Sequence, residues 1–146
     1  MSARDFFSDA DRQAIRAAIA DAENTTSGEI RLHVESRCKA DDVLDRAAGV
    51  FEVLGMHKTA LRNGVLFYLA TEDRQFAILG DGGINTVVPN DFWDGVRDTV
   101  IQGLAAGDAV EGLAAGIRLA GDQLAAHFPV ATGDVNELSD DISFGS

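Results

Sequence analysis

The feature that most constrains this chain is an unbroken run of apolar residues from Val65 to Ala70. A run of this density is typical of a central strand that is covered on both faces of its sheet. Thr71 to Arg74 can form a tight turn, and Gln75 to Leu79 then resumes the apolar pattern. Because so short a connection cannot form a crossover, the two segments are predicted to pair as an antiparallel hairpin.

The segments before this hairpin predict two helices and a strand. Residues 8–23 repeat apolar positions at helical spacing behind a capping serine, and residues 30–34 alternate between apolar and polar side chains as a strand does. Asp41 or Asp42 can cap a second amphipathic helix, and Gly55 supplies its end.

The segments after the hairpin predict a loop and two further helices. Gly80 to Pro89 is rich in glycine and is expected to be a loop. Asn90 or Asp91 can cap a third helix, which residues 103–107 break, and a long helix then follows from Asp108 to about His127. The glycines within that helix weaken it and predict close approach of another backbone: Gly112, Gly116 and Gly121.

The order helix, strand, helix, strand, strand, helix, helix predicts an α/β fold: a small mixed β-sheet sandwiched between helices on both faces. The length of 146 residues fits one domain with one core. We assign residues 1–129 to this domain. Residues 130–146 are acidic and small, and are predicted to be a C-terminal tail without a core of its own.

The acidic composition restricts the possible partners. A net charge of -12 repels nucleic acid and anionic membrane surfaces, whereas a cationic partner or a divalent metal ion is electrostatically favoured. The single cysteine, Cys38, cannot form an internal disulfide. No signal peptide and no apolar segment long enough to span a membrane is visible. We therefore expect a monomer in the cytoplasm that binds another protein and is not inserted in a membrane.

Several catalytic signatures are absent from the sequence. It has no P-loop and no G-x-S-x-G motif, and Gly80 to Asn85 fails the dinucleotide-binding pattern at its last position. Cys38 is followed by Leu44 at the position where a cysteine phosphatase loop needs an arginine. The histidines do not have the spacing of a zinc site: His33, His57 and His127. No organic cofactor is expected.

The loop from Gly80 to Asn90 carries the strongest candidate for a metal site. Asp81 lies between glycines just after a predicted strand, and Asp91 and Asp94 open the next helix. Calcium takes roughly six to eight oxygen ligands, which carboxylates and the backbone carbonyls of a glycine loop can supply. This pattern predicts a Ca²⁺ site, or a Mg²⁺ site. A structural alternative stays open, in which Asp81 belongs to a turn and Asp91 caps a helix.

Three stretches together resemble the TPM (TPM phosphatase) domain family: Thr26–Ile30, Asn63–Arg74 and Leu79–Ile84. The ending of the last helix and the tail resemble the short cytoplasmic bacterial members of that family: residues 126–129 and 136–144. The resemblance implies a sheet flanked by helices on both faces. It also implies calcium binding, as in some bacterial members, or phosphatase activity, as in plant members.

The resemblance adds Glu29 to the candidate metal ligands, because this carboxylate lies within the first matching stretch. The alternative for Glu29 is a solvent-facing strand residue that pairs with a lysine or an arginine. The metal-ligand hypothesis therefore comprises four carboxylates: Asp81, Asp91, Asp94 and Glu29.

Two functions of different classes follow from this sequence. The first is a calcium-binding protein-interaction module without catalysis, which uses a groove beside residues 80–93. The second is a metal-dependent phosphatase for phosphomonoesters, in which an ion held by Asp81 and Asp91 polarises the phosphate. Against the second hypothesis, the loop has no lysine or arginine to bind phosphate; Arg74 and Arg97 are the nearest.

Overall fold

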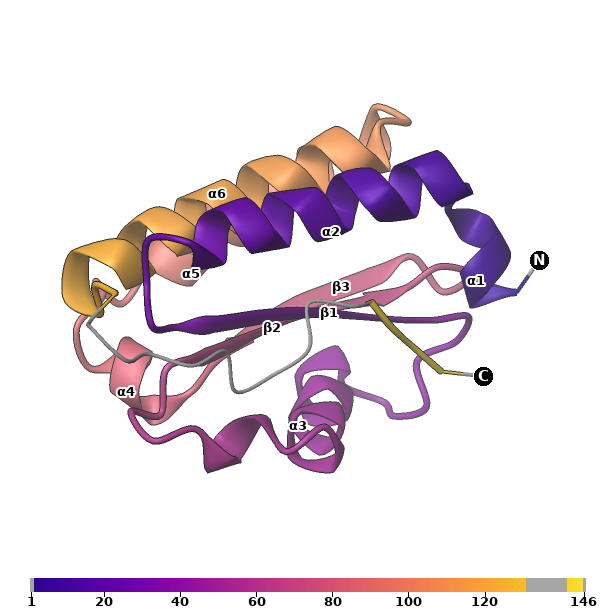
Figure 1. The fold of residues 1–146 in the computed structure, drawn as a ribbon. Helices are drawn as coiled ribbons and strands as arrows, with labels where there is room; N and C mark the ends of the chain where they lie inside the picture. Colours follow the sequence, from indigo (N-terminus) through magenta and orange to yellow (C-terminus); the bar gives the residue numbers. More distant parts are fainter. Residues whose placement is uncertain (1, 131–141, 146) are drawn as a thin grey trace.

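The computed structural model describes residues 2–130 and 142–145. Its helices are α1 (Ala3–Phe6), α2 (Asp9–Glu23), α3 (Val43–Val53), the 3₁₀ helix η1 (Met56–Lys58), α4 (Gly82–Asn85), α5 (Phe92–Ala105) and α6 (Ala109–His127). Its strands are β1 (Glu29–Glu35), β2 (Gly64–Ala70), β3 (Gln75–Gly80) and β4 (Ser143–Phe144). The predicted α/β fold class is confirmed, and Figure 1 shows the sheet between two layers of helices.

The sheet is mixed, with the strand order β3-β2-β1-β4. β2 and β3 form the predicted antiparallel hairpin. β1 pairs with the other edge of β2 in parallel, with Ile30 opposite Val65, and α3 lies in the crossover between them. β4 pairs in parallel with β1 at its outer edge. The end of the predicted tail therefore contributes a strand to the sheet, whereas residues 131–141 of that tail lie outside the described residues.

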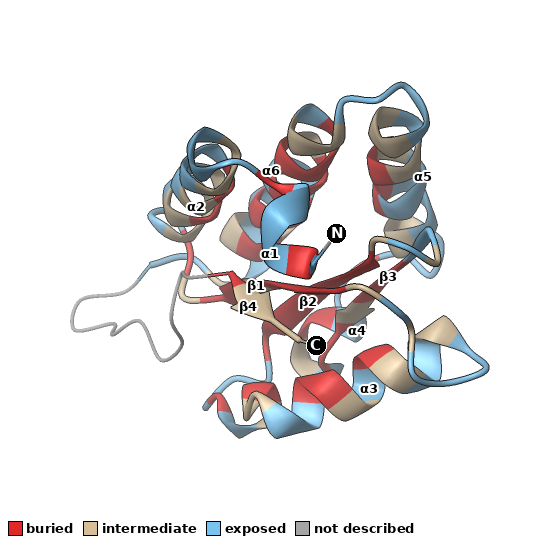
Figure 2. Cartoon of the chain, turned by 90° about the vertical axis from the view of Figure 1, so that its right-hand side faces the viewer, coloured by how far each residue is buried: buried red, intermediate tan, exposed pale blue. Residues whose placement is uncertain are grey.

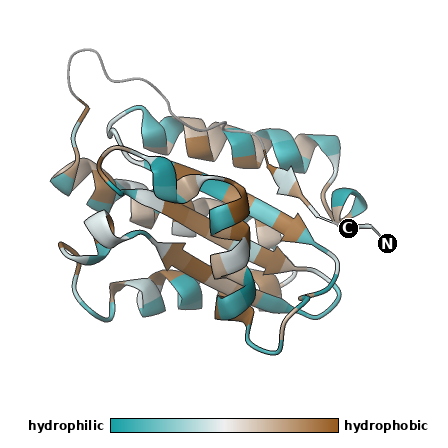
Figure 3. Ribbon diagram, turned by 90° about the horizontal axis from the view of Figure 1, so that it is seen from below, coloured by the Kyte–Doolittle hydropathy of each residue, from teal (hydrophilic) through white to brown (hydrophobic). Residues whose placement is uncertain are grey.

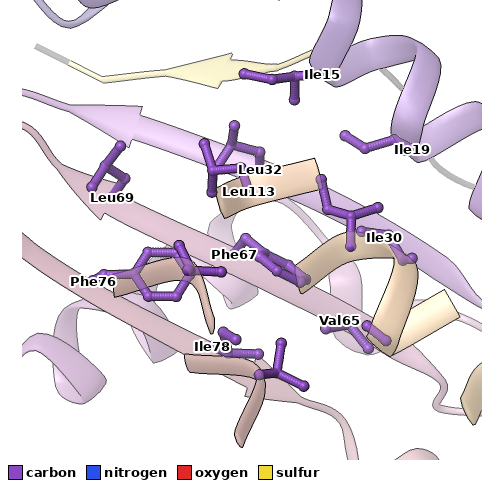
Figure 4. Packing of buried hydrophobic residues seen from close by; sticks show 14 of the residues in the cluster. Ile15, Ile19, Ile30, Leu32, Val65, Phe67, Leu69, Phe76, Ile78 and Leu113 are labelled. Atoms are coloured by element: carbon purple, nitrogen blue, oxygen red, sulfur yellow. The ribbon is translucent and has the colours of Figure 1, made fainter. Parts of the chain in front are cut away.

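The two faces of β2 explain its continuous apolar sequence. Val65, Phe67 and Leu69 lie in the larger core, beneath α2, α5 and α6. Leu66, Tyr68 and Ala70 lie in a smaller core against α3. Figure 4 shows Phe67 and Phe76 among aliphatic side chains of the larger core. In Figure 2 the buried surfaces of the helices face the sheet, and in Figure 3 the strands are mostly hydrophobic while the helices carry hydrophilic turns.

Glycines let α6 approach its neighbours closely, as predicted. A Cβ atom on Gly103 of α5 would lie 2.5 Å from the Cα of Gly112 in α6, and one on Gly121 would lie 2.8 Å from the Cβ of Ala22 in α2. Side chains at these positions would push the three helices apart. The predicted break of this helix within residues 103–107 is confirmed, because α5 ends at Ala105 and Gly107 follows with a left-handed φ of 78°.

The glycine-rich segment after β3, which was predicted to be a loop, is partly helical. Gly82 to Asn85 forms α4, and the Asp81 carboxylate accepts a hydrogen bond from the Gly82 backbone N–H at its start. The sequence pattern missed this turn because two glycines lower helix propensity. Asp91 precedes α5 as expected, but its side chain makes no capping hydrogen bond.

Candidate functional site

Two arginine–carboxylate pairs lie at opposite ends of the sheet. In the first, Nε and Nη2 of Arg62, just before β2, donate to Oδ2 and Oδ1 of Asp81, just after β3, at 2.7 and 2.8 Å. In the second, Nε and Nη2 of Arg46 in α3 donate to Oε2 and Oε1 of Glu35 at the end of β1, both at 2.8 Å. Both pairs are bidentate, but their surroundings differ.

Asp81 is held at the end of β3 by backbone and side-chain contacts. Its N–H donates to the Gly64 carbonyl at 2.9 Å, and its Oδ1 accepts from the Gly82 N–H at 2.7 Å. The residue is only 7% exposed. Burial by itself raises the pKa of Asp81, but the hydrogen bonds from Arg62 and Gly82 outweigh it and lower that pKa below its ordinary value. Asp81 is therefore a buried, ionised carboxylate.

The loop that carries Arg62 is packed tightly against α4. Arg62 has a φ of 53°, in the left-handed region that non-glycine residues rarely adopt. A Cβ atom on Gly83 would lie 2.1 Å from the carbonyl oxygen of Leu61, so a larger residue cannot replace this glycine without displacing the loop. The Arg62 side chain nevertheless reaches solvent, because it is 57% exposed.

A cleft of about 310 Å³ opens beside this pair, and we call it the Asp81 cleft. It is lined by Ala48, Phe51, Glu52, His57, Arg62, Leu79, Gly80 and Asp81. The lining therefore combines apolar side chains with charged ones. Its volume is at the lower end of the range of small-ligand sites, which is about 300–1,000 Å³.

Several buried polar atoms that lack a hydrogen-bond partner belong to the segment that precedes β2, in which His57 and Arg62 line the Asp81 cleft. Within the described residues, the segment before β2 contributes three such buried atoms: His57 Nδ1, Thr59 Oγ1 and Asn63 Nδ2. Thr59 and Asn63 are 4% and 1% exposed. Since buried polar groups are normally satisfied, this concentration distinguishes the Asp81 end of the molecule as one that can receive a polar ligand or water.

The structure does not gather the four predicted metal ligands into one site. Asp81 is paired with Arg62, while Asp91 and Asp94 are exposed at the start of α5. Glu29 lies at the same sheet end as Asp81 but on the far side of β2, opposite Gly64. It is 2% exposed, so the alternative of a solvent-facing Glu29 is wrong.

Among residues 2–130 and 142–145, no three His, Cys, Asp or Glu side chains are grouped so that they could hold a metal ion. In this arrangement the residues therefore do not fit a calcium ion with its several oxygen ligands. Calcium binding stays a prediction.

Sequence reasoning missed Arg62 and named Arg74 and Arg97 instead. Arg74 lies in the turn at the other end of the hairpin, and Arg97 is an exposed residue of α5 beside Asp98. The hairpin prediction could have indicated Arg62. An antiparallel hairpin places residues that precede its first strand, such as Arg62, next to those that follow its second strand, such as Asp81.

The other pair belongs to a buried group that we call the Glu35 cluster: Glu35, Arg46, Tyr68 and His33. Glu35 is 0% exposed and accepts a hydrogen bond from the Tyr68 hydroxyl. His33 Nε2 lies 3.1 Å from Glu35 Oε1, and His33 Nδ1 lies 2.9 Å from the Ser143 hydroxyl of β4. Because a carboxylate only accepts, the neutral imidazole carries its proton on Nε2 and accepts from Ser143.

The protonation states of the Glu35 cluster follow from these contacts. Burial raises the pKa of Glu35, but the hydrogen bonds from Arg46, Tyr68 and His33 together lower it to about 2. Burial lowers the pKa of His33, and burial together with Glu35 raises that of Tyr68. Glu35 thus stays ionised and is saturated with donors. This cluster connects β1, β2, α3 and β4.

The TPM domain model matches residues 2–123, which is most of the chain. The chain belongs to the TPM domain family. A solved relative of this TPM domain is the BA42 protein of the psychrophilic bacterium Bizionia argentinensis, determined by NMR. It is 47% identical, with 96% of each chain covered and a TM-score of 0.88. The comparison with curated proteins found no match to this chain.

Two more distant NMR structures share the fold of this TPM domain. The N-terminal domain of the cg2496 protein from Corynebacterium glutamicum is 19% identical, with 90% of this chain and 81% of that chain covered and a TM-score of 0.66. The N-terminal domain of a P. gingivalis protein is 18% identical, with 84% and 78% covered and a TM-score of 0.66. In the described residues of this TPM domain, no helix is both long and apolar enough to cross a membrane.

Proposed function

We propose that this TPM domain is a protein-interaction module that receives a side chain of its partner in the Asp81 cleft. The observation that carries the proposal is the cleft itself, which is lined by apolar side chains, by charged groups and by His57, whose ring nitrogen Nδ1 is buried and unpaired. A cleft of this size accommodates one large side chain of a partner. The partner's polar group would satisfy His57 Nδ1, and its apolar atoms would contact Phe51 and Leu79.

Two residues that neighbour cleft-lining residues in sequence are exposed and apolar. Val53 follows Glu52 and is 84% exposed, and Leu61 precedes Arg62 and is 54% exposed. The net charge of -12 favours a basic partner, because complementary charge increases the rate of association.

The test compares two alanine-to-tryptophan variants of the full chain. Ala48 is an exposed residue of α3 that lines the cleft, so Ala48→Trp fills the cleft without altering the core. Ala17→Trp on α2 is the matched control, since Ala17 is also an exposed helical alanine but lies on the other side of the sheet. Wild type, control and cleft variant are each used to isolate binding proteins from a cell extract, with partners identified by mass spectrometry.

A protein retained by wild type and Ala17→Trp and lost with Ala48→Trp would support the proposal. An identical set of proteins for all three baits would contradict it. Thermal melting of the variants shows whether the tryptophan has altered the fold.

Calcium binding is a separate part of the proposal and is tested separately. A ligand set that includes Asp81 must compete with the Arg62 guanidinium, so Arg62→Gln should bind calcium more tightly than wild type does. Ca²⁺ and then Mg²⁺ are titrated into both metal-stripped proteins while the amide NMR shifts of residues 80–94 are recorded. Saturable shifts that tighten in Arg62→Gln would support the site. If neither protein shows a saturable shift, the proposed calcium site is contradicted.

Hydrolysis of phosphomonoesters is the second candidate, and one observation favours it. Arg62 and His57 both line the Asp81 cleft, so it contains the cation and the imidazole that the glycine-rich segment lacks. The assay measures p-nitrophenyl phosphate turnover with and without Mg²⁺. Activity that is lost in Arg62→Gln and kept in Arg97→Gln, an exposed arginine on α5, would support hydrolysis in the cleft. Absence of turnover in wild type would contradict hydrolysis, and the interaction module would remain as the proposed function.

A further inference from the structure

The C-terminal strand β4 docks on β1 through specific contacts along its whole length. In the backbone, Ser143 and Phe144 lie opposite His33 and Val34, and the Gly145 N–H donates to the Val34 carbonyl at 2.9 Å. Figure 1 shows β4 at the outer edge of the sheet, at the end where α1 lies. Only two residues of β4 pair with the seven-residue strand β1, so the backbone contribution is short.

Each side chain of this segment has its own contact. Ile142 is 8% exposed and belongs to the larger core. The Ser143 hydroxyl lies 2.9 Å from Nδ1 of His33. The Phe144 ring has the guanidinium carbon of Arg4, in α1, 4.8 Å from its centroid, which is cation–π geometry.

Gly145 occupies a position that has no space for a side chain. A Cβ atom at this position would lie 2.6 Å from Glu35 Oε1 and 3.1 Å from His33 Nε2. These atoms cannot easily move aside, because Arg46 and Tyr68 hold the Glu35 carboxylate in place. The outer edge of β1 is thus occupied by an aliphatic residue, serine, an aromatic residue and glycine in consecutive positions, and the last position has no space for a side chain.

We infer that the edge of β1 from His33 to Glu35 is a recognition site for an extended protein segment with this pattern. In the structure the chain's own residues 142–145 fill the site. A partner that carries the same pattern binds by adding its strand to β1 after β4 has left, which is strand addition at an exposed sheet edge. Release is feasible because so short a terminal strand opens at low cost compared with the core strands.

The test uses the full chain with its own strand weakened. Gly145→Ala introduces the clash with Glu35, whereas Gly95→Ala is the matched control, since a Cβ atom there meets nothing within 4 Å. We expect Gly145→Ala to shift the backbone amide signals of residues 33–35 and to remove the slow hydrogen exchange of the residue 145 amide. Gly95→Ala should change neither.

A synthetic peptide with the sequence of residues 138–146 then serves as the partner. It should bind Gly145→Ala with saturable amide shifts at His33 to Glu35, and bind wild type at least about tenfold more weakly, because the intact strand occupies the site. The same peptide carrying Gly145→Ala should not bind either protein. A Ser143→Ala peptide should bind more weakly than the parent peptide.

Three results would overturn the inference. The first is a Gly145→Ala protein whose β4 stays docked, since the glycine would then not be selected. The second is a released strand with no binding of the peptide. The third is equal binding of the glycine and alanine peptides, which would indicate contact without recognition of the pattern.

Discussion

The two arginine–carboxylate pairs have the same bidentate geometry but opposite surroundings. Glu35 is fully buried and accepts from Arg46, Tyr68 and His33, so its hydrogen-bonding capacity is used. Asp81 is also buried, but its arginine is 57% exposed, and it lines a cleft together with His57, whose Nδ1 has no hydrogen-bond partner. The difference indicates that the Glu35 end maintains the architecture and that the Asp81 end can exchange contacts with a ligand.

The largest expected effect comes from breaking the buried pair. Arg46→Leu leaves the Glu35 carboxylate buried without its cation and should lower the free energy of unfolding by about 3–5 kcal/mol. Urea denaturation measures this change. Arg118→Leu, which breaks the exposed pair with Glu111, is the control and should cost less than about 1 kcal/mol. Equal effects of the two variants would remove the distinction between buried and exposed pairs.

The second largest expected effect is the loss of folding stability when acid protonates Glu35. The pKa of Glu35 is lowered from 4.5 to about 2 on folding, so its contribution is fully present above pH 4.5 and is lost as the pH falls toward 2. This loss amounts to about 3 kcal/mol. Urea denaturation at pH 6, 4.5 and 3 should show a smaller loss for Glu35→Gln than for wild type.

His33 contributes to acid sensitivity at higher pH and must be separated from Glu35. Its pKa is lowered, so the folded state favours the neutral ring and loses stability as the pH falls below 6.5. The difference between wild type and Glu35→Gln from pH 4.5 to pH 3 isolates the carboxylate. Parallel curves for the two proteins in that interval would contradict the assignment.

A pair of neighbouring glycines tests the rigidity of the Asp81 end. Gly83→Ala places a methyl group against the Leu61 carbonyl and should cost about 1–3 kcal/mol, the usual range for overpacking. Gly82→Ala is the control, because nothing lies within 4 Å of its Cβ position. Denaturation curves and the amide shift of Arg62 report both stability and loop displacement. Equal effects would mean that the loop carrying Arg62 is not held by α4.

The smallest expected effect is that of Arg62→Gln on stability. Solvent screens the exposed guanidinium, and water can hydrate Asp81 from the cleft side once the pair is broken. The Tm should therefore fall much less than it does in Arg46→Leu, and added salt should reduce the difference from wild type. A loss as large as that of Arg46→Leu would show that the two ends have the same structural role.

The sequence alone determined the hairpin, the longer helices and the layers of this protein. The run from Val65 to Ala70 predicted a strand covered on both faces, and the turn after it predicted the hairpin. Ser8, Asp42 and Asp108 cap their helices as residue type and spacing indicated. These features depend on neighbours a few positions apart, which local periodicity records.

Only the tertiary structure decided which distant residues meet. Asp81 was predicted as a site residue, but its pairing with Arg62 depends on the hairpin bringing the two strand ends together. Glu35 meets Tyr68 because β1 pairs in parallel with β2, and Ser143 reaches His33 from 110 positions away. Hydrophobic periodicity indicates which face is buried but does not specify the partner that covers it, because apolar burial is non-directional; strand pairing and helix packing make that choice.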